Sequence, residues 1–158
     1  MCTHHELTPM TQPAKLSSEA AGRMCAAGTL RRATRSVARL YDSRLARVGL
    51  TTTQFSILRA LGQHGEPVPL SRLAEEQVFE RTSLYRALEP LRRDGLVKLG
   101  GEEGRKAKTA SLTARGWRLV ERALPHWEEA QAVFLEHVGR PEWARLSAQL
   151  VSIVDIAR

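Results

Sequence analysis

The stretch from Leu70 to Leu112 constrains the fold more than any other part of the chain. At its centre, three leucines recur at helical spacing and form one apolar stripe, Leu84, Leu88 and Leu91. Hydroxyl groups, a phenol and arginines occupy the other sides of the same segment. Gly95 follows at once and supplies the left-handed residue at which many helices stop. The pattern therefore predicts a helix from Arg81 to Asp94 that buries one face and exposes a polar one.

The segments on either side of this helix add the parts of a known motif. A shorter helix is predicted before it, over Leu70 to Gln77. After it come a short strand over Leu96 to Leu99, a turn over Gly100 to Arg105, and a return strand over Ala107 to Leu112. A short helix, a tight turn, a second helix and a hairpin make a winged helix-turn-helix, which places one helix in the DNA major groove. The alternative is a small α+β core with a solvated polar face.

The charge of the chain favours a polyanionic partner, because the formal net charge is +7. Three basic residues lie at the hairpin tip and on the return strand, where a wing meets phosphate: Arg105, Lys106 and Lys108. From Arg23 to Arg47 there are seven arginines and one acid, whereas the chain from Ser111 onward has six basic and six acidic residues. The basic part suits a DNA-facing surface, and the neutral final third suits a protein-facing one.

Other classes of function lack their usual sequence signals. There is no Gly-rich phosphate loop, HExxH, GxSxG or clustered carboxylate pair, so we expect neither an enzyme nor a cofactor. Cys2, His4 and His5 lack a fourth ligand and a fixed spacing, so no metal site is predicted. No apolar run could span a bilayer, no signal peptide is evident, and two cysteines make no disulfide framework. The expected location is the cytoplasm, at the nucleoid.

The predicted layout has three parts and a fold that is mainly α with a small β-hairpin wing. Residues 1–18 form a flexible arm, and residues 49–112 form the winged helix-turn-helix domain. Residues 19–48 and 113–158 form a helical dimerisation region, because their wide apolar faces exceed what so small a domain can cover. Its last helix carries the stripe Leu146, Leu150 and Ile153. Pro125 is expected to kink or interrupt the helix before it, because proline removes one backbone donor.

Four stretches of this chain resemble the MarR family of bacterial winged helix-turn-helix regulators. They are GLTTTQFSILRAL (Gly49 to Leu61), PLSRLAEEQ (Pro69 to Gln77), ERTSLYRALEPLRRDGLV (Glu80 to Val97) and SLTARG (Ser111 to Gly116). The resemblance covers the chain from about Cys25 to the C-terminus, and the third stretch is close to the most characteristic segment of the family.

The resemblance implies a homodimer that binds a pseudo-palindromic operator and is controlled by a small, often aromatic or phenolic, ligand. Thr82, Ser83, Tyr85 and Arg86 fall on positions that read the groove in the family, and Arg81 begins the same exposed face. The wing departs from the family pattern, which has an acid two residues before an arginine. Counted back from the Leu-Thr pair, those positions hold Gly104 and Lys106, with Glu103 one place early and Arg105 between them.

Two further expectations concern control of the regulator. A ligand pocket is predicted near Tyr41, Phe55 and Trp117, where the first two helices meet the long one, and its occupation would release DNA from a repressor. One branch of the family senses hydroperoxides through a cysteine in the first helix, but that position corresponds to Ala27 here, two residues from Cys25. A thiol-based sensor using Cys25 remains one alternative. A winged-helix module that binds protein instead of DNA is the other.

Overall fold

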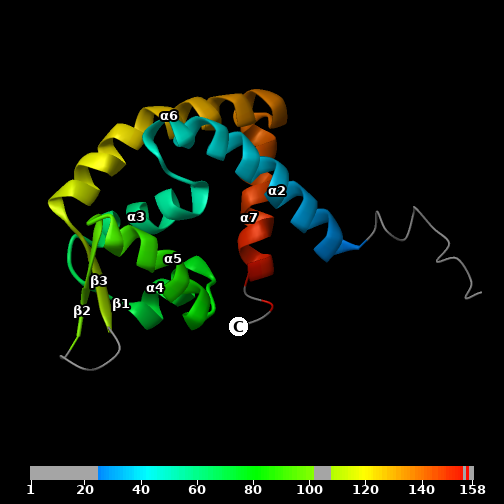
Figure 1. The fold of residues 1–158 in the computed structure, drawn as a ribbon. Coiled ribbons are helices and arrows are strands. Elements are labelled where there is room, and N and C mark those ends of the chain that lie inside the picture. The colour runs from blue at the N-terminus through cyan, green and yellow to red at the C-terminus, as the bar shows by residue number, and fades with distance from the viewer. Residues whose placement is uncertain (1–24, 102–107, 155, 157–158) are drawn as a thin grey trace, which may run out of the picture. The chain divides into compact units, whose positions relative to one another are not determined.

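The computed structural model describes residues 25–101, 108–154 and 156. Figure 1 shows the helices and strands in chain order. They are α2 (Ala26–Leu45), the 3-10 helix η1 (Ala46–Val48), α3 (Thr52–His64), β1 (Val68–Pro69), α4 (Leu70–Gln77), α5 (Arg81–Arg93), β2 (Val97–Gly100), β3 (Thr109–Leu112), α6 (Ala114–Val138) and α7 (Arg140–Val154). The chain divides into two compact units, residues 1–36 and residues 37–158. The predicted fold class, mainly helical with a β-hairpin wing, is confirmed.

The start of α3 is fixed by its own residues and by the end of α2. Thr51 and Gln54 form a capping box, in which the Thr51 hydroxyl accepts from the Gln54 amide at 3.2 Å and the Gln54 side chain accepts from the Thr51 amide at 2.9 Å. The amide and the hydroxyl of Thr52 both donate to Asp42 Oδ1 at 2.6 Å. The first amides of α3 therefore have partners, and the corner between the second half of α2 and α3 is held by charge-assisted hydrogen bonds.

The sheet has three antiparallel strands in the order β1-β3-β2. The predicted hairpin is its β2–β3 pair, with Val97 opposite Leu112 and Gly100 opposite Thr109. The strand β1 was not predicted from the sequence; it is only two residues long and pairs with the other edge of β3. Because α4 begins at the residue after β1, the first helix of the motif is joined directly to the sheet.

The core of the second unit lies among α3, α4, α5 and the sheet. The predicted stripe of α5 is buried, with Leu84 at 1% and Leu88 and Leu91 at 0% exposure. They pack in one cluster with apolar side chains of the neighbouring elements, among them Leu45, Phe55, Ile57, Leu58, Leu61 and Leu73. Burying one side chain of this size stabilises the fold by about 1.5–3 kcal/mol. The face of α5 opposite this stripe is therefore the one left to solvent.

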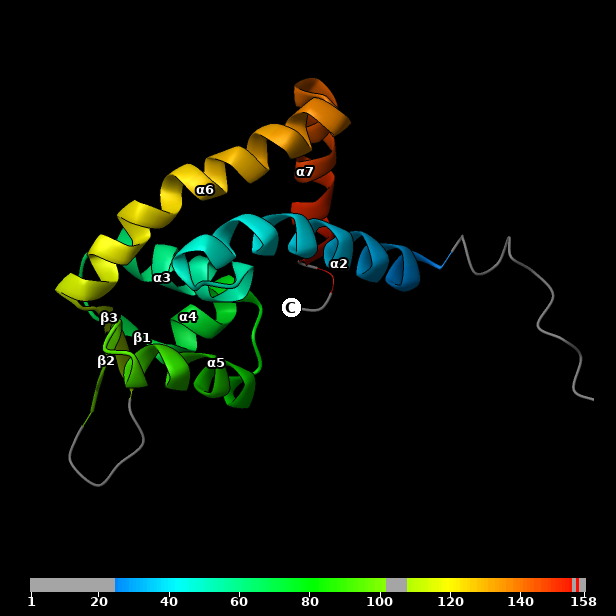
Figure 2. The same cartoon turned by 45° about the horizontal axis from the view of Figure 1, so that its top comes forward.

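The long helix α6 runs from Ala114 to Val138 with Pro125 inside it, so the proline does not interrupt the helix. A proline removes a single donor from the helical ladder, and the flanking turns are anchored by Ala123 and Ala130, both at 0% exposure. Helix α7 leaves the end of α6 at a sharp corner, at Gly139 (Figure 2). Phe134 and Trp143 pack edge to face across this corner, with ring centroids 4.9 Å apart.

Large apolar side chains are exposed along α6 and α7. Among the described residues, every exposed side chain of this kind except Val78 lies in α6, in α7 or just after α7. Leu146 and Ile153 are exposed and Leu150 is half-buried, and α7 contains no buried residue. Such a concentration is unusual for a surface that faces only water.

Candidate nucleic-acid interface

The helix-turn-helix consists of α4, a three-residue turn from Val78 to Glu80, and α5. The turn is closed by the Phe79 amide, which donates to the Ala74 carbonyl at 2.8 Å, and by the Leu84 amide, which donates to the Glu80 carbonyl at 2.9 Å. These hydrogen bonds satisfy backbone groups at the end of α4 and the start of α5. They fix the entry angle of α5 without any side-chain cap at Glu80.

Val78 has a backbone conformation that suits its residue type poorly. It ends α4 with φ 53° and ψ 45°, in the left-handed region, although it is β-branched and its side chain is 67% exposed. An L-residue with a Cβ loses about 1–2 kcal/mol in this region, and burial of the Val78 side chain recovers little of that loss. The surrounding turn therefore holds Val78 in a strained state.

We expect Val78→Gly to stabilise the protein by about 1 kcal/mol, because glycine adopts the left-handed region without the steric cost. Val78→Ala is the matched control, since it keeps a Cβ and should gain less than half as much. The free energy of unfolding can be compared by urea titration at a constant m-value. A glycine variant less stable than the original chain would show that the turn carries no strain.

The exposed face of α5 holds the residues predicted to contact DNA. Arg81, Thr82, Ser83 and Arg86 are exposed, whereas Tyr85 is half-buried and packs against the core. Among the described residues, neither Arg81 nor Arg86 has an ion pair or a side-chain hydrogen bond. Two guanidinium groups are thus available to a phosphate or to a base edge within the first half of the helix.

Two acids of the helix-turn-helix, Glu89 in α5 and Glu76 in α4, are already paired with basic residues. The Arg92 guanidinium donates to both oxygens of Glu89, at 2.6 and 2.9 Å, and this hydrogen bonding lowers the pKa of the Glu89 carboxyl. Hydrogen bonds from His64 and from Arg72, both at 2.9 Å, lower the pKa of Glu76. Both carboxyls thus keep their negative charge beside a cation, which reduces their repulsion of a nearby polyanion.

The described part of the wing ends before its tip. Arg105 and Lys106, predicted to contact phosphate, lie outside the described residues, as do Gly104 and Glu103. Lys108 is exposed at the base of the wing, where its amide donates to the Gly100 carbonyl and its carbonyl accepts from the Leu70 amide, both at 2.8 Å. The wing is therefore hydrogen-bonded to the first residue of α4.

The residues predicted to form a ligand pocket do not all lie together. Tyr41 and Phe55 are buried and each packs against Trp127, with ring centroids 6.4 Å apart in both pairs. Trp117 is 43% exposed and lies against Gly62 instead. The sequence analysis did not select Trp127, although its spacing from the buried Ala123 and Ala130 could have placed it on the same face of α6.

Polar groups surround this aromatic cluster. The Arg59 guanidinium carbon lies 4.9 Å from the centroid of the Trp127 ring, within the range of a cation–π interaction. The Tyr41 hydroxyl donates to Gln131, and burial raises the pKa of Tyr41, so its proton is retained over the physiological range. The cluster is thus aromatic at its centre, with one cation and one phenol at its edge.

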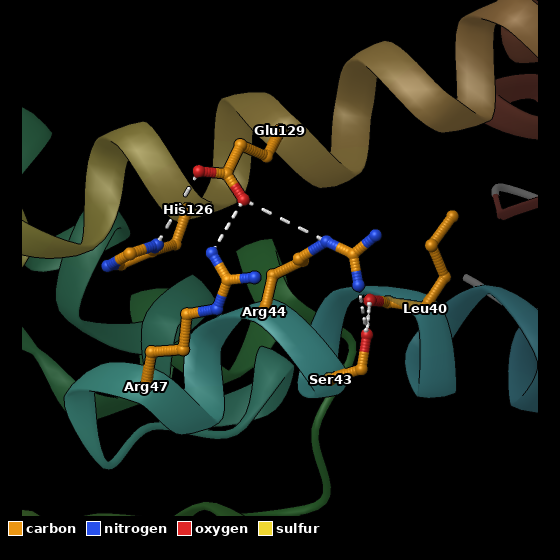
Figure 3. A network of polar contacts seen from close by, with 6 residues as sticks. All are labelled: Leu40, Ser43, Arg44, Arg47, His126 and Glu129. Carbon is orange, nitrogen blue, oxygen red and sulfur yellow. Dashed lines mark hydrogen bonds and ion pairs between the residues drawn. The ribbon is translucent and has the colours of Figure 1, made fainter.

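A further polar network joins the end of α2 and η1 to α6 (Figure 3). Glu129 Oε2 is 2.9 Å from Arg47 Nη1 and 3.9 Å from Arg44 Nε, and Glu129 Oε1 is 4.0 Å from His126 Nδ1. These side chains are partly or largely exposed, so each pair contributes about 0–1 kcal/mol to the stability of the fold.

Cys25, the residue that a thiol-based sensor would use, is exposed just before α2.

Comparison with known proteins identifies the family. A winged helix DNA-binding domain matches residues 50–116. The crystal structure of the M. tuberculosis transcriptional regulator MosR in complex with DNA is 37% identical, with a TM-score of 0.74 over 84% of this chain and 96% of that one. The E. coli MarR structure with operator DNA shares the fold, at 19% identity and a TM-score of 0.72, over 86% of this chain and 99% of that one. An uncharacterised HTH-type transcriptional regulator of Bacillus cereus is 30% identical over 115 residues, 73% of this chain and 76% of the relative.

The chain belongs to the MarR family. This is a family of transcriptional regulators rather than of enzymes, so the protein is a MarR-like regulator with a DNA-binding winged helix. None of the helices in the described part combines the length and the apolar character that a membrane crossing requires. The expected family and the expected fold are both confirmed.

Proposed function

We propose that this MarR-family protein is a repressor that binds a pseudo-palindromic operator as a homodimer and is released by a small ligand. The proposed DNA contact rests on the exposure of Arg81 and Arg86 and on their lack of an intramolecular partner among the described residues. Arg86 lies on the face of α5 opposite the buried leucines, whereas Arg81 is exposed at the first residue of the helix. An exposed, unpaired arginine on such a helix can form the bidentate contact with guanine that is common in the major groove.

We expect Arg86→Ala to weaken operator binding by about 1–3 kcal/mol and to weaken binding to random DNA much less. Arg92→Ala is the matched control, because Arg92 lies on the same helix but is already paired with Glu89. The operator is first obtained by selecting bound fragments of the source genome, and affinities are then measured by gel shift. An equal loss on operator and random DNA would assign Arg86 to the phosphate contacts instead.

The salt dependence of the same gel shifts tests DNA binding itself. Phosphate contacts release counterions, so the affinity must fall linearly on a log–log plot as salt rises. A winged-helix module that binds only protein would not shift the DNA, so it would show no slope of log affinity against log salt. The M. tuberculosis regulator, which is 37% identical to this chain, was solved with bound DNA, and this supports the proposal that the present chain binds DNA rather than protein.

The proposed homodimer rests on the apolar surface of α6 and α7. A single chain leaves Leu146 and Ile153 exposed to water, and a second copy that covers them would recover the hydrophobic free energy. Each copy would present one α5 to one half-site, about one helical turn of DNA apart. The predicted dimerisation region includes residues 19–48, but the proposal needs only α6 and α7.

The proposed effector is a small aromatic or phenolic molecule, as the family resemblance implies. Tyr41 is 7% exposed and Phe55 is 2% exposed, so a ligand that touches both rings must first displace side chains around Trp127. Arg59 would then supply a positive charge beside the opened cluster. A ligand that lowers DNA affinity in this way must itself bind less tightly to the DNA complex, and titration of both forms measures that difference.

A further inference from the structure

A separate cavity of about 300 Å³ lies between η1, the end of α5 and the first turns of α6. Three arginines of α6 line it, namely Arg115, Arg118 and Arg122. Asp94 is the acid among its lining residues, and Leu96 and Leu119 are among its apolar ones. A volume of this size is at the lower end of the range for small-molecule sites.

The three arginines are arranged for a common ligand. They follow each other at i, i+3 and i+7, so their side chains lie on one face of α6. Among the described residues, none of the three has an ion pair or a side-chain hydrogen bond. By contrast, Arg47 nearby is paired with Glu129, and Arg92 is paired with Glu89. Three exposed guanidinium groups around a cavity that one carboxylate, Asp94, also lines favour an anion over a neutral molecule.

The cavity is distinct from the surface proposed to read DNA. Asp94 lies at the C-terminal end of α5, eight residues after Arg86, which corresponds to about 12 Å along a helix. It is also distinct from the aromatic cluster at Trp127, which shares no lining residue with it. A ligand here would therefore be bound by residues that neither of the proposals above uses.

We propose that this cavity binds a small molecule that carries two anionic groups, phosphate or carboxylate. Arg115 and Arg122 are about 10 Å apart along the helix axis, so a ligand with two anionic groups can place one group near each end of the row. Two anionic groups joined by a short spacer would reach all three arginines, with the spacer beside Leu96 and Leu119. The Asp94 carboxylate repels such a ligand, so it limits the affinity.

Isothermal titration calorimetry on the full chain tests the proposal, with pyrophosphate and succinate as probes and with acetate as the single-charge comparison. Ionic strength is held constant with sodium chloride. We expect binding of at least one doubly charged probe and much weaker binding of acetate. The double variant Arg118→Ala/Arg122→Ala should lose at least about tenfold in affinity for that probe, because it removes two of the three guanidinium groups that would hold the anion.

Two further variants keep the test independent of misfolding. Asp94→Asn removes the repelling charge, so it should bind the same probe several-fold more tightly than the original chain, a gain that an unfolded protein cannot show. Arg140→Ala removes an exposed arginine of α7 that lies outside the cavity, and it should leave the affinity unchanged.

Three results would overturn the proposal. They are no binding of either doubly charged probe, equal binding by the double variant, and an unchanged affinity in Asp94→Asn. If the second of these results came with a loss of bulk DNA affinity in the double variant, Arg118 and Arg122 would be assigned to DNA contact instead. Because the probes are titrated without DNA, a failure here leaves the operator proposal unaffected.

Discussion

Gly116→Ala is expected to destabilise the protein by about 3–5 kcal/mol, a large share of the 5–15 kcal/mol that holds a typical domain together. Gly116 lies in the first turn of α6, buried against Leu96, just before β2, and against Leu112, the last residue of β3. A Cβ at this position would overlap the carbonyl oxygen of Leu96 and would lie 3.0 Å from the Leu112 Cδ2 atom. Glycine is needed here because backbone, and not a flexible side chain, occupies the space.

The backbone at Leu96 cannot move aside without further loss. Its carbonyl accepts from the Thr113 amide at 3.1 Å and from the Thr113 hydroxyl at 3.2 Å, and that hydroxyl in turn accepts from the Gly116 amide at 3.0 Å. These are the N-cap contacts of α6. Any shift that relieved the overlap would break them, so the steric cost and the loss of the cap add together.

Two other glycines give a graded comparison for this prediction. At Gly28 in α2, an added Cβ would meet only Cys25 atoms at 3.7 Å, so Gly28→Ala should stabilise its helix by up to about 1 kcal/mol. At Gly62 an added Cβ would meet side-chain atoms of Leu112 and Trp117 at 3.3 Å. These side chains can move aside, so Gly62→Ala should change the free energy of unfolding only slightly. Urea unfolding followed by circular dichroism ranks the three variants. An unchanged midpoint for Gly116→Ala would contradict the close packing described for α6.

Leu150→Asp is expected to abolish the homodimer and to lower operator affinity by at least about 100-fold, because two linked half-sites are then bound one at a time. Leu150 lies between Leu146 and Ile153 on the apolar stripe of α7. A carboxylate at this position would be desolvated within the proposed interface without a partner, which costs several kcal/mol. Sedimentation measures the oligomeric state, and gel shift measures the operator affinity.

Ala148→Asp is the control for that variant. Ala148 is exposed and lies about 160° around α7 from Leu150, so it adds the same charge on the opposite face. The control should remain dimeric and bind DNA normally. A Leu150→Asp protein that still sediments as a dimer and binds the operator normally would remove α7 from the proposed interface.

Sequence reasoning worked best where a single local pattern decides the structure. The stripe of Leu84, Leu88 and Leu91 predicted both the existence of α5 and its buried face, because helical spacing leaves one arrangement for three leucines. The capping box at Thr51 and the cap at Thr113 are local in the same way, since each depends on residues three apart. Such contacts lie within a few residues of one another in the chain.

Features that depend on contacts between distant segments of the chain could not be predicted in this way. The strand β1 exists because β3 offers a free edge, and two residues carry no periodicity of their own. Trp127 and not Trp117 meets Tyr41 and Phe55, since the rotation of α6 about its axis is set by packing. The arginine-lined cavity was equally invisible, because Asp94 and Arg122 are neighbours only in the folded chain.

The backbone of Lys108 joins the wing to the helix-turn-helix. Its amide bonds to β2 and its carbonyl bonds to the first residue of α4, so a strand of the wing and the first helix of the motif share one residue. A wing that tilts must therefore pull α4 with it. For the DNA-binding dimer proposed above, this coupling means that the wing and the helix-turn-helix of one copy would move together. A change in the distance between the two DNA-binding parts would then have to arise in the helices proposed to join the copies, α6 and α7.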